Sequence, residues 1–298
     1  MIIDSFTKRA IQQALKDDIG SRDITTSAVL HKAKRAKFVI LAKQEFVISG
    51  LGAAETAFEL VDETIRFKPL VNDGSGVAKS KAIAYVDGRC WSVLSAERTA
   101  LNFLCWLSGI STLTRRFVKA VEGTKAQITD TRKTIPAFRH LQKYAVRMGK
   151  GLNHRFGLYD QILIKDNHIA SIMAEPTVVK DRRAAIRSAL EAAKKSIAKG
   201  KKIEVEIDNL DMLKAALSLN PDIIMLDNMS LADIKEAVKL RDAYRFRAGD
   251  LGFNLLLEAS GGINIENVRE VAEAGVDSIS VGALTHSAPA VDISLEVR

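Results

Sequence analysis

From Gly123 onward, short apolar runs alternate with amphipathic segments, and this alternation limits most strongly the folds that the chain can adopt. The apolar runs are residues 126–130, 161–166, 202–208, 222–228, 255–262 and 278–284. Amphipathic segments separate the later runs and occupy residues 209–219, 230–244 and 264–275. Ser230 and Asn264 are the predicted N-caps of the last two. Repeated strand–helix units indicate parallel strands joined by right-handed crossovers, so the pattern predicts a (β/α) barrel, complete or incomplete.

The first third of the chain has a different pattern. Short β-like runs occupy residues 38–42, 46–48, 65–67 and 82–86. A helical piece over residues 53–61 interrupts these runs, and a long helix is predicted from Ser92 onward. The sequence therefore predicts a small α+β unit before the barrel.

Hydropathy and cysteine usage bear on the compartment. Residues 1–20 have the spacing of an amphipathic helix and lack the pattern of a signal peptide. The most apolar window, residues 100–110, is far shorter than the roughly 20 residues that a membrane span needs. Cys90 and Cys105 are isolated thiols outside any metal-binding spacing. We expect a cytoplasmic protein that does not cross a membrane.

Positive charge is concentrated in one stretch of the chain. Residues 132–168 hold eight Lys or Arg against two acids, while the whole chain has a formal net charge of +8. So one-sided a segment indicates a site for an anion. Nucleic acid is not the expected anion, because aromatic residues make up only 6% of the chain and no nucleic-acid motif occurs. The basic segment 181–202 is interpreted as a solvated helix face.

In a barrel of parallel strands, the functional groups lie where the strands end. The polar residues and glycines at these ends are Asp130, Thr131, Arg132, Lys133, Lys165, Asp166, Glu206, Asp208, Asp227, Asn228, Ser260, Gly261, Gly262 and Gly282. Glycine turns after the last two strands predict a phosphate site, although glycines can also serve tight turns alone. Glu206 and Asp227 close consecutive strands, so their carboxylates can bind Mg²⁺ or ribose hydroxyls, or pair with the basic cluster.

Several runs, in this order along the chain, resemble a known family. The runs are DIGSRDITT, ERTALN, TRKT, YAVRMGKGLNHRFGLYDQILIKDNH, EVEIDNL, IMLDN, EASGGI and SVGALTHSAPAVDIS. They resemble the carboxylating nicotinate-nucleotide pyrophosphorylases, also called quinolinate phosphoribosyltransferases, of the type II phosphoribosyltransferase family. With this resemblance we expect an N-terminal α+β open-sheet sandwich domain over residues 1–115 and a C-terminal incomplete (β/α) barrel over residues 116–284. The tail, residues 285–298, is expected to pack back on the first domain.

The resemblance implies a reaction and a set of site residues. The reaction is phosphoribosyl transfer from phosphoribosyl pyrophosphate to quinolinate with decarboxylation, which gives nicotinate mononucleotide, pyrophosphate and CO₂ with Mg²⁺, in NAD biosynthesis. The residues implied for the quinolinate pocket are Arg132, His154, Arg155 and Lys165. Those implied for the sugar donor are Lys133 at the pyrophosphate, and Glu206 and Asp227 at the ribose and the metal, directly or through substrate or water. Those implied for the 5′-phosphate are Ser260, Gly261, Gly262, Gly282 and His286.

Helical spacing and the family resemblance predict different roles for Arg98. Its spacing in the predicted helix favours an exposed arginine paired with a nearby acid such as Glu97. In the family, a matching arginine is contributed by the partner subunit. The resemblance therefore implies a homodimer, or an assembly of dimers, in which Arg98 crosses the interface.

The chain departs from the usual family pattern at a few positions. Ile135 and Ala137 stand in a run that commonly reads TRKTTPG, and Met148 and Lys150 stand in a run that is commonly glycine-rich. Lys150 adds a cation and removes backbone freedom. Three alternatives stay open: a molybdenum-transport-associated pyrophosphorylase of the same superfamily, a barrel decarboxylase or aldolase that uses the Lys165 amine, and a non-enzymatic binder of phosphometabolites or RNA.

Overall fold

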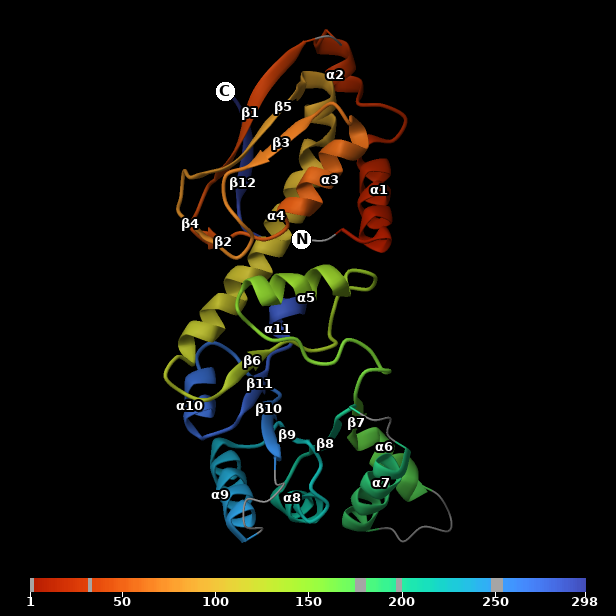
Figure 1. Cartoon of the computed structure of the whole chain (residues 1–298), viewed down its shortest axis with the longest axis vertical. Coiled ribbons are helices and arrows are strands. Elements are labelled where there is room, and N and C mark those ends of the chain that lie inside the picture. Colours follow the sequence, from red (N-terminus) through yellow and green to blue (C-terminus); the bar gives the residue numbers. More distant parts are fainter. Residues whose placement is uncertain (1–2, 32–33, 175–180, 197–199, 248–253) are drawn as a thin grey trace. The chain divides into compact units, whose positions relative to one another are not determined.

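The computed structural model describes residues 3–31, 34–174, 181–196, 200–247 and 254–298. The chain divides into two compact units (Figure 1). Unit 1 comprises residues 1–116, 133–151 and 283–298, and unit 2 comprises residues 117–132 and 152–282. Residues 133–151, which the expected boundaries assign to the barrel, group with unit 1. One cause is that the Ser111 hydroxyl donates a hydrogen bond of 2.8 Å to the Ala145 carbonyl.

Unit 1 combines helices with antiparallel strands. Its helices are α1 (Ser5–Ile19), α2 (Ile24–Val29), α3 (Leu51–Val61), α4 (Cys90–Ala120, whose last residues belong to unit 2), α5 (Arg139–Met148) and α11 (Ala283–His286). Its strands are β1 (Arg35–Ala42), β2 (Phe46–Val47), β3 (Arg66–Pro69), β4 (Gly76–Val77), β5 (Ala82–Arg89) and β12 (Ile293–Val297). Four strands form one sheet in the order β12-β1-β5-β3, and β2 pairs with β4.

The C-terminal strand β12 forms an edge of the unit 1 sheet. Phe38 of β1 pairs with Val297, and Ala42 pairs with Ile293, in antiparallel register. Every second residue of β1 from Phe38 onward, including Ile40, is buried in the core of unit 1. The open antiparallel sheet and its helices confirm the α+β fold predicted for the N-terminal part of the chain.

Unit 2 combines parallel strands with the helices that connect them. Its strands are β6 (Gln127–Thr129), β7 (Ile162–Ile164), β8 (Ile203–Ile207), β9 (Ile223–Asp227), β10 (Leu256–Ser260) and β11 (Ser278–Ser280). Its helices are α6 (Asp166–Ala174), α7 (Arg182–Ser196), α8 (Leu210–Leu217), α9 (Leu231–Arg247) and α10 (Val268–Glu273). The sheet order is β6-β11-β10-β9-β8-β7, and every neighbouring pair is parallel. This arrangement confirms the predicted incomplete (β/α) barrel.

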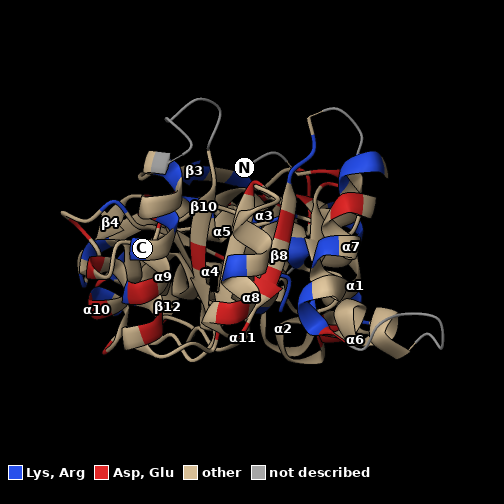
Figure 2. Cartoon of the chain, turned by 90° about the horizontal axis from the view of Figure 1, so that it is seen from below, with Lys and Arg blue, Asp and Glu red and all other residues tan. Residues whose placement is uncertain are grey.

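The two faces of this sheet differ in chemistry, because side chains alternate along each strand. One face carries the buried apolar residues Ile203, Val205 and Ile207 of β8 and Leu257 and Ala259 of β10. The other face carries Glu204 and Glu206 of β8 and Glu258 and Ser260 of β10. The acidic residues on β8 are visible in Figure 2. The polar face therefore carries the functional groups Glu206 and Ser260 near the C-terminal ends of their strands.

Local predictions in unit 2 had different outcomes. The Ser230 hydroxyl accepts a hydrogen bond of 3.1 Å from the Asp233 N–H, which confirms Ser230 as the cap of α9. The Asn264 prediction is wrong, because its side chain caps a turn by accepting from the Asn267 N–H at 2.9 Å, and α10 begins only at Val268. Helix α7 carries several Lys and Arg residues (Figure 2), and Arg183, Arg187, Lys194 and Lys195 among them are exposed. Residues 197–199 of that basic segment lie outside the described residues.

Among the described residues, no helix combines sufficient length with sufficient hydropathy to span a membrane. The longest helix in the described part of the chain, α4, contains charged residues such as Glu97 and Arg98.

Candidate active site

The strands of unit 2 are parallel, so their C-terminal ends lie along one edge of the sheet. In sheet order from β6 to β7, the residues within one position of these ends are Asp130, Ser280, Ser260, Asp227, Glu206 and Lys165. Ser260 and Asp227 are direct partners in the register of β10 and β9. Glu206 pairs with Met225, two residues before Asp227, so both carboxylates lie on the same face of the sheet.

Lys165 and Glu206 form an ion pair at this edge. The Lys165 Nζ lies 2.6 Å from the Glu206 Oε2, and the Lys165 side chain is 42% exposed whereas that of Glu206 is 10% exposed. The ammonium group therefore lies at the mouth of the barrel, with the carboxylate beneath it. An anionic ligand at this place would meet the Lys165 charge first.

The turn after β10 requires glycine. Gly261 has φ +88°, and a Cβ atom at this position would lie 2.3 Å from the Asn228 side-chain oxygen and 2.8 Å from the Asn228 backbone nitrogen. The Asn228 N–H donates to the Ser260 carbonyl at 2.9 Å, and the Asn228 side-chain amide donates to the Asp227 Oδ2 at 2.8 Å. The glycine turn and the Asp227 carboxylate are thus held together by Asn228, a strand-end residue to which sequence reasoning assigned no role.

Residues 152–161, which lead into β7, belong to unit 2. Leu152 pairs with Thr129 of β6 through a single parallel bridge. Beyond it, the buried Asp130 carboxylate accepts hydrogen bonds from the His154 N–H at 2.8 Å and the Asn153 side-chain amide at 2.7 Å. At the far end of the segment, the Asp160 carboxylate accepts from backbone N–H groups. Asp130 therefore fixes the segment to the end of β6, and Asp160 closes a turn within the segment.

Arg155 lies within this segment and is only 8% exposed. Its NH1 group donates to the Gln161 carbonyl at 3.1 Å, while its buried Nε–H has no hydrogen-bond partner among the described residues. Burial, followed by the positive charge of the nearby Arg132, lowers the pKa of Arg155. A buried guanidinium with an unused donor beside a second cation has the chemistry of an anion site.

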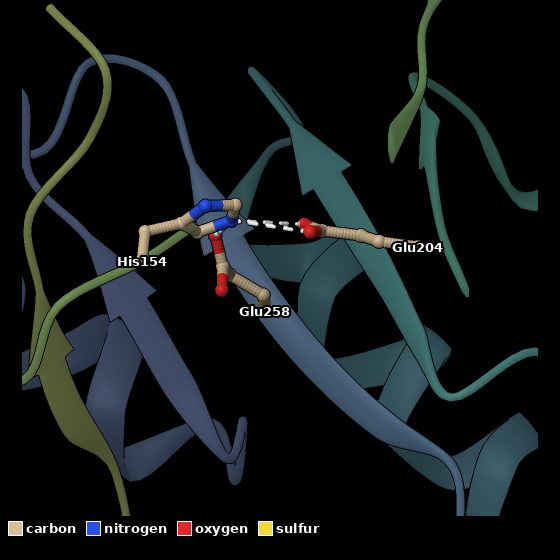
Figure 3. A group of neighbouring side chains, drawn as sticks. All are labelled: His154, Glu204 and Glu258. Carbon is tan, nitrogen blue, oxygen red and sulfur yellow. Dashed lines mark hydrogen bonds and ion pairs between the residues drawn. The ribbon is translucent and has the colours of Figure 1, made fainter. Parts of the chain in front are cut away.

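His154 points across the barrel interior toward two glutamates that sequence reasoning missed (Figure 3). Its Nε2 lies 3.1 Å from the Glu204 Oε2 and 3.5 Å from the Glu258 Oε1. Three strands separate β6 from β8 in the sheet order, so this contact requires the sheet to curve into a barrel wall. The His154 ring is therefore engaged by protein groups inside the barrel, below the strand ends.

Glu204 and Glu258 are both buried. Burial, followed by the neighbouring Glu204 carboxylate, raises the pKa of Glu258 to about 7. The sequence did contain an indication of these residues, because Glu204 precedes Glu206 by two positions and Glu258 precedes Ser260 by two. Period-two spacing in a buried strand places both members of each pair on one face.

Other predicted site residues belong to unit 1. Arg98 is an exposed residue of α4, and its guanidinium forms no hydrogen bond or ion pair with any residue that the structure describes. Its sequence-based pairing with Glu97 is thus not an ion pair, although the Arg98 charge opposes the rise in the pKa of Glu97 that burial causes. Lys133 is exposed, and its carbonyl accepts from the Thr285 hydroxyl at 2.7 Å. His286 is exposed at the end of α11.

Two of the departures from the usual family pattern adopt the backbone conformation that favours glycine. Ala137 has φ 68° and Lys150 has φ 71°. A residue with a side chain in this region costs roughly 1–2 kcal/mol relative to the right-handed region. The backbone at these two positions therefore adopts the left-handed conformation without glycine. No contact among the described residues explains the choice of alanine and lysine there.

Comparison with known proteins matches both parts of the chain to one family. A family model described as the quinolinate phosphoribosyl transferase N-terminal domain matches residues 23–108, and the model of the C-terminal domain matches residues 110–296. A protein of Methanocaldococcus jannaschii named probable nicotinate-nucleotide pyrophosphorylase [carboxylating] is 39% identical over 298 residues, covering 99% of each chain. The nicotinate-nucleotide pyrophosphorylase of Mycobacterium leprae is 40% identical, covering 96% of this chain and 95% of its own. The solved structure of the nicotinate-nucleotide pyrophosphorylase from Francisella tularensis has a TM-score of 0.88 and 37% identity, covering 100% of this chain and 98% of its own.

Proposed function

Because the chain belongs to the quinolinate phosphoribosyltransferase family, we propose that it transfers a phosphoribosyl group from phosphoribosyl pyrophosphate to quinolinate, with decarboxylation. The products are nicotinate mononucleotide, pyrophosphate and CO₂, in a step of NAD biosynthesis. The family that the sequence motifs indicated is confirmed by the matched models. The alternatives of an aldolase, a non-enzymatic anion binder and a molybdenum-transport-associated protein have no support in these matches.

One observation in the structure carries the choice of substrate. Arg155 is a buried guanidinium with an unused Nε–H, next to the charge of Arg132. Such a group is costly to bury unless an anion pairs with it. Guanidinium groups bind carboxylates through paired donors, and quinolinate has two carboxylates on adjacent ring carbons. A dianionic aromatic acid therefore suits the pair of arginines.

The acids at the strand ends suit the transfer step. Departure of pyrophosphate leaves positive charge on the ribose carbon that is attacked, and the Glu206 and Asp227 carboxylates on one face of the sheet stabilise that charge. The ring nitrogen of quinolinate then bonds to this carbon. The resulting pyridinium stabilises negative charge on the adjacent ring carbon, so the carboxylate on that carbon leaves as CO₂. The bonding electron pair stays on this carbon, which then takes a proton from solvent to give nicotinate mononucleotide. Lys165 lies beside Glu206 and is proposed to hold a substrate carboxylate.

Mg²⁺ is the proposed cofactor. Glu206 and Asp227 offer carboxylate oxygens, which are the protein ligands that this ion prefers, and the ion also binds phosphate oxygens of substrates. The residues present therefore fit the ion, and these two would hold it directly or through substrate or water. When bound, the ion would neutralise charge on the leaving pyrophosphate.

The remaining groups are proposed to bind the phosphates. The turn Ser260–Gly262 supplies backbone N–H groups without side-chain obstruction, and Gly282 precedes α11 directly. His286 is proposed to assist at the 5′-phosphate, and Lys133 at the pyrophosphate. Both side chains are exposed, as a contact with a diffusing substrate requires.

The proposed assembly is a cytoplasmic homodimer or an assembly of dimers. Its support is Arg98, which is exposed and has no ion-pair partner in the described part of the chain. The family resemblance gives this arginine to the site of the neighbouring subunit.

Product formation with two pyridine acids tests the proposal. Purified protein is incubated with phosphoribosyl pyrophosphate, Mg²⁺ and either quinolinate or nicotinate, and nicotinate mononucleotide is followed by chromatography. We expect product from quinolinate, and far less from nicotinate because nicotinate has only one carboxylate for the arginines. Equal rates with the two acids, or no product from quinolinate, would refute the proposed substrate.

A further inference from the structure

Glu204 lies in the barrel interior and interacts with two side chains at once. It is fully buried, and its Oε2 lies 3.1 Å from the His154 Nε2. The same oxygen accepts a hydrogen bond from the Gln161 side-chain amide. Glu258 faces the same His154 nitrogen, and its Oε1 accepts no hydrogen bond from a described residue. The three groups His154, Glu204 and Glu258 form a cluster with the residue types of a metal site, so this cluster needs an explanation.

The tautomer of His154 decides between a metal site and a hydrogen-bonded network. Its Nδ1 accepts a hydrogen bond of 2.8 Å from the Arg155 N–H, so Nδ1 carries no proton. The ring proton is therefore on Nε2, which faces the two glutamates. A metal bound at Nε2 would need the opposite arrangement, with the proton on Nδ1 and donated to an acceptor. The geometry thus favours a hydrogen bond from Nε2–H to Glu204.

Two chains of hydrogen bonds lead from Glu204 to Arg155. In the first, Glu204 fixes the His154 ring, whose Nδ1 holds the Arg155 backbone N–H. In the second, Glu204 fixes the Gln161 side chain, and the Gln161 carbonyl accepts from the Arg155 NH1 at 3.1 Å. Both the backbone and the guanidinium of Arg155 are therefore connected to one buried carboxylate.

We propose that Glu204 is a positioning residue of the quinolinate site, which fixes His154 as the Nε2–H tautomer and, through His154 and Gln161, orients Arg155. The identity of the ligand in this statement rests on the proposed function. Glu204 acts here as an acceptor of hydrogen bonds. Its negative charge alone would weaken the binding of a dianion to Arg155. The charge of Glu204 thus lowers the affinity for quinolinate, whereas its orientation of Arg155 raises that affinity.

The tautomer is measured without any substrate. Long-range ¹H–¹⁵N spectra resolve the ring nitrogens of the five histidines, and the His154→Gln variant identifies the His154 signals by their loss. At neutral pH we expect a protonated Nε2 and an unprotonated Nδ1 in wild type and in Glu204→Gln, with no change when Zn²⁺ is added. A protonated Nδ1, or a shift of the His154 signals on addition of Zn²⁺, would overturn the proposal.

Steady-state kinetics measure the effect on the ligand. Glu204→Leu removes the acceptor, and we expect the KM for quinolinate to rise about 10-fold or more, as loss of a hydrogen bond to a charged group implies, with the KM for phosphoribosyl pyrophosphate within about 2-fold. Glu204→Gln keeps an acceptor oxygen, so its KM for quinolinate is expected within about 3-fold of wild type. The matched control is Glu191→Leu, an exposed acid on α7.

Gln161→Leu keeps the test decisive if Glu204→Leu does not fold. This substitution removes only the hydrogen bond between Gln161 and Glu204, at a partly exposed residue, and leaves the contact between Glu204 and His154. It is also expected to raise the KM for quinolinate. An unchanged KM in Glu204→Leu and Gln161→Leu, or a lower KM in Glu204→Gln, would show that orientation by Glu204 is not needed. Inactive wild-type protein would instead refute the proposed function, and the tautomer measurement would then decide the positioning role alone.

Discussion

At the scale of single residues, the site is built from groups that are unfavourable for stability. Arg155 is buried with an unused donor and lies near the Arg132 charge. Gly261 adopts a backbone conformation in which a side chain would collide with Asn228. Such features persist when surrounding structure determines them, and they are concentrated at ligand sites. Two substitutions separate their contributions to stability and to binding.

The first prediction concerns Arg155→Met. We expect the KM for quinolinate to rise about 100-fold, because a charge-assisted hydrogen bond to a carboxylate is worth roughly 2–3 kcal/mol. We expect the melting temperature to stay the same or to rise, because the substitution removes a buried charge whose Nε–H has no hydrogen-bond partner among the described residues. Kinetics and thermal unfolding measure the two effects, with Arg187→Met on the exposed surface of α7 as control. A large loss of stability with an unchanged KM would contradict the assigned role.

The second prediction compares Gly261→Ala with Gly123→Ala. Both glycines have similar backbone angles, φ +88° and φ +84°, but a Cβ atom at Gly123 would meet nothing within 4 Å. The Gly123 variant should lose about 1 kcal/mol from backbone strain alone, and the Gly261 variant about 2–4 kcal/mol because the collision with Asn228 is added. Thermal unfolding compares them. The KM for phosphoribosyl pyrophosphate should rise only in Gly261→Ala. Equal losses of folding stability in the two variants would contradict a collision between the side chain introduced at position 261 and Asn228.

At the scale of elements, hydrophobic periodicity and strand-end position predicted the barrel strands and the site residues at their ends. The same signals did not reveal the acids inside the strands. Apolar runs and helical spacing located the strands of the barrel, and the ends of β8, β9 and β10 gave Glu206, Asp227 and Ser260. The buried acids Glu204 and Glu258 were missed, because a carboxylate inside a strand is expected only where a partner from another part of the chain meets it. That partner, the segment after β6, approaches only through the curvature of the sheet.

The third prediction concerns the pH dependence of stability through Glu258. Its pKa is raised to about 7 by burial and by Glu204, above the ordinary value of 4.5. The stability that the protonated Glu258 side chain contributes to the folded protein is fully present below pH 4.5. This stability is lost as the pH rises from 4.5 through about 7. Glu258→Gln stays neutral, so its melting temperature relative to wild type should be higher at pH 8 than at pH 5, equivalent to about 2–3 kcal/mol. A difference that does not change with pH would contradict a protonated Glu258.

At the scale of the whole molecule, the sequence motifs predicted the family and the two kinds of fold, since long motifs in a fixed order identify a family better than any single element. The grouping of residues 133–151 with unit 1 was not predicted. Helix α5 follows the end of β6 closely in sequence. Hydrogen bonds from Arg115 to the Gly149 and Met148 carbonyls, and close packing of Gly149 against Thr114, attach the end of α5 to α4. Sequence periodicity does not report such contacts.

The fourth prediction concerns the assembly. Arg98→Ala and Lys165→Ala are each expected to be inactive, and co-expression should restore about a quarter of the wild-type activity. The reason is that half of the dimers would be mixed and each mixed dimer would hold one intact site of two. Activity of the purified mixture measures this, with each variant alone as control. No recovery in mixed dimers would place Arg98 in the site of its own subunit.

The central claim is that phosphoribosyl transfer and decarboxylation of quinolinate take place together. The most direct measurement uses quinolinate labelled in the carboxylate next to the ring nitrogen, with phosphoribosyl pyrophosphate and Mg²⁺, and counts labelled CO₂ and pyrophosphate in the same sample. The account predicts equal amounts of the two products, and no labelled CO₂ without the sugar donor. Pyrophosphate without labelled CO₂, or labelled CO₂ in the absence of phosphoribosyl pyrophosphate, would contradict it.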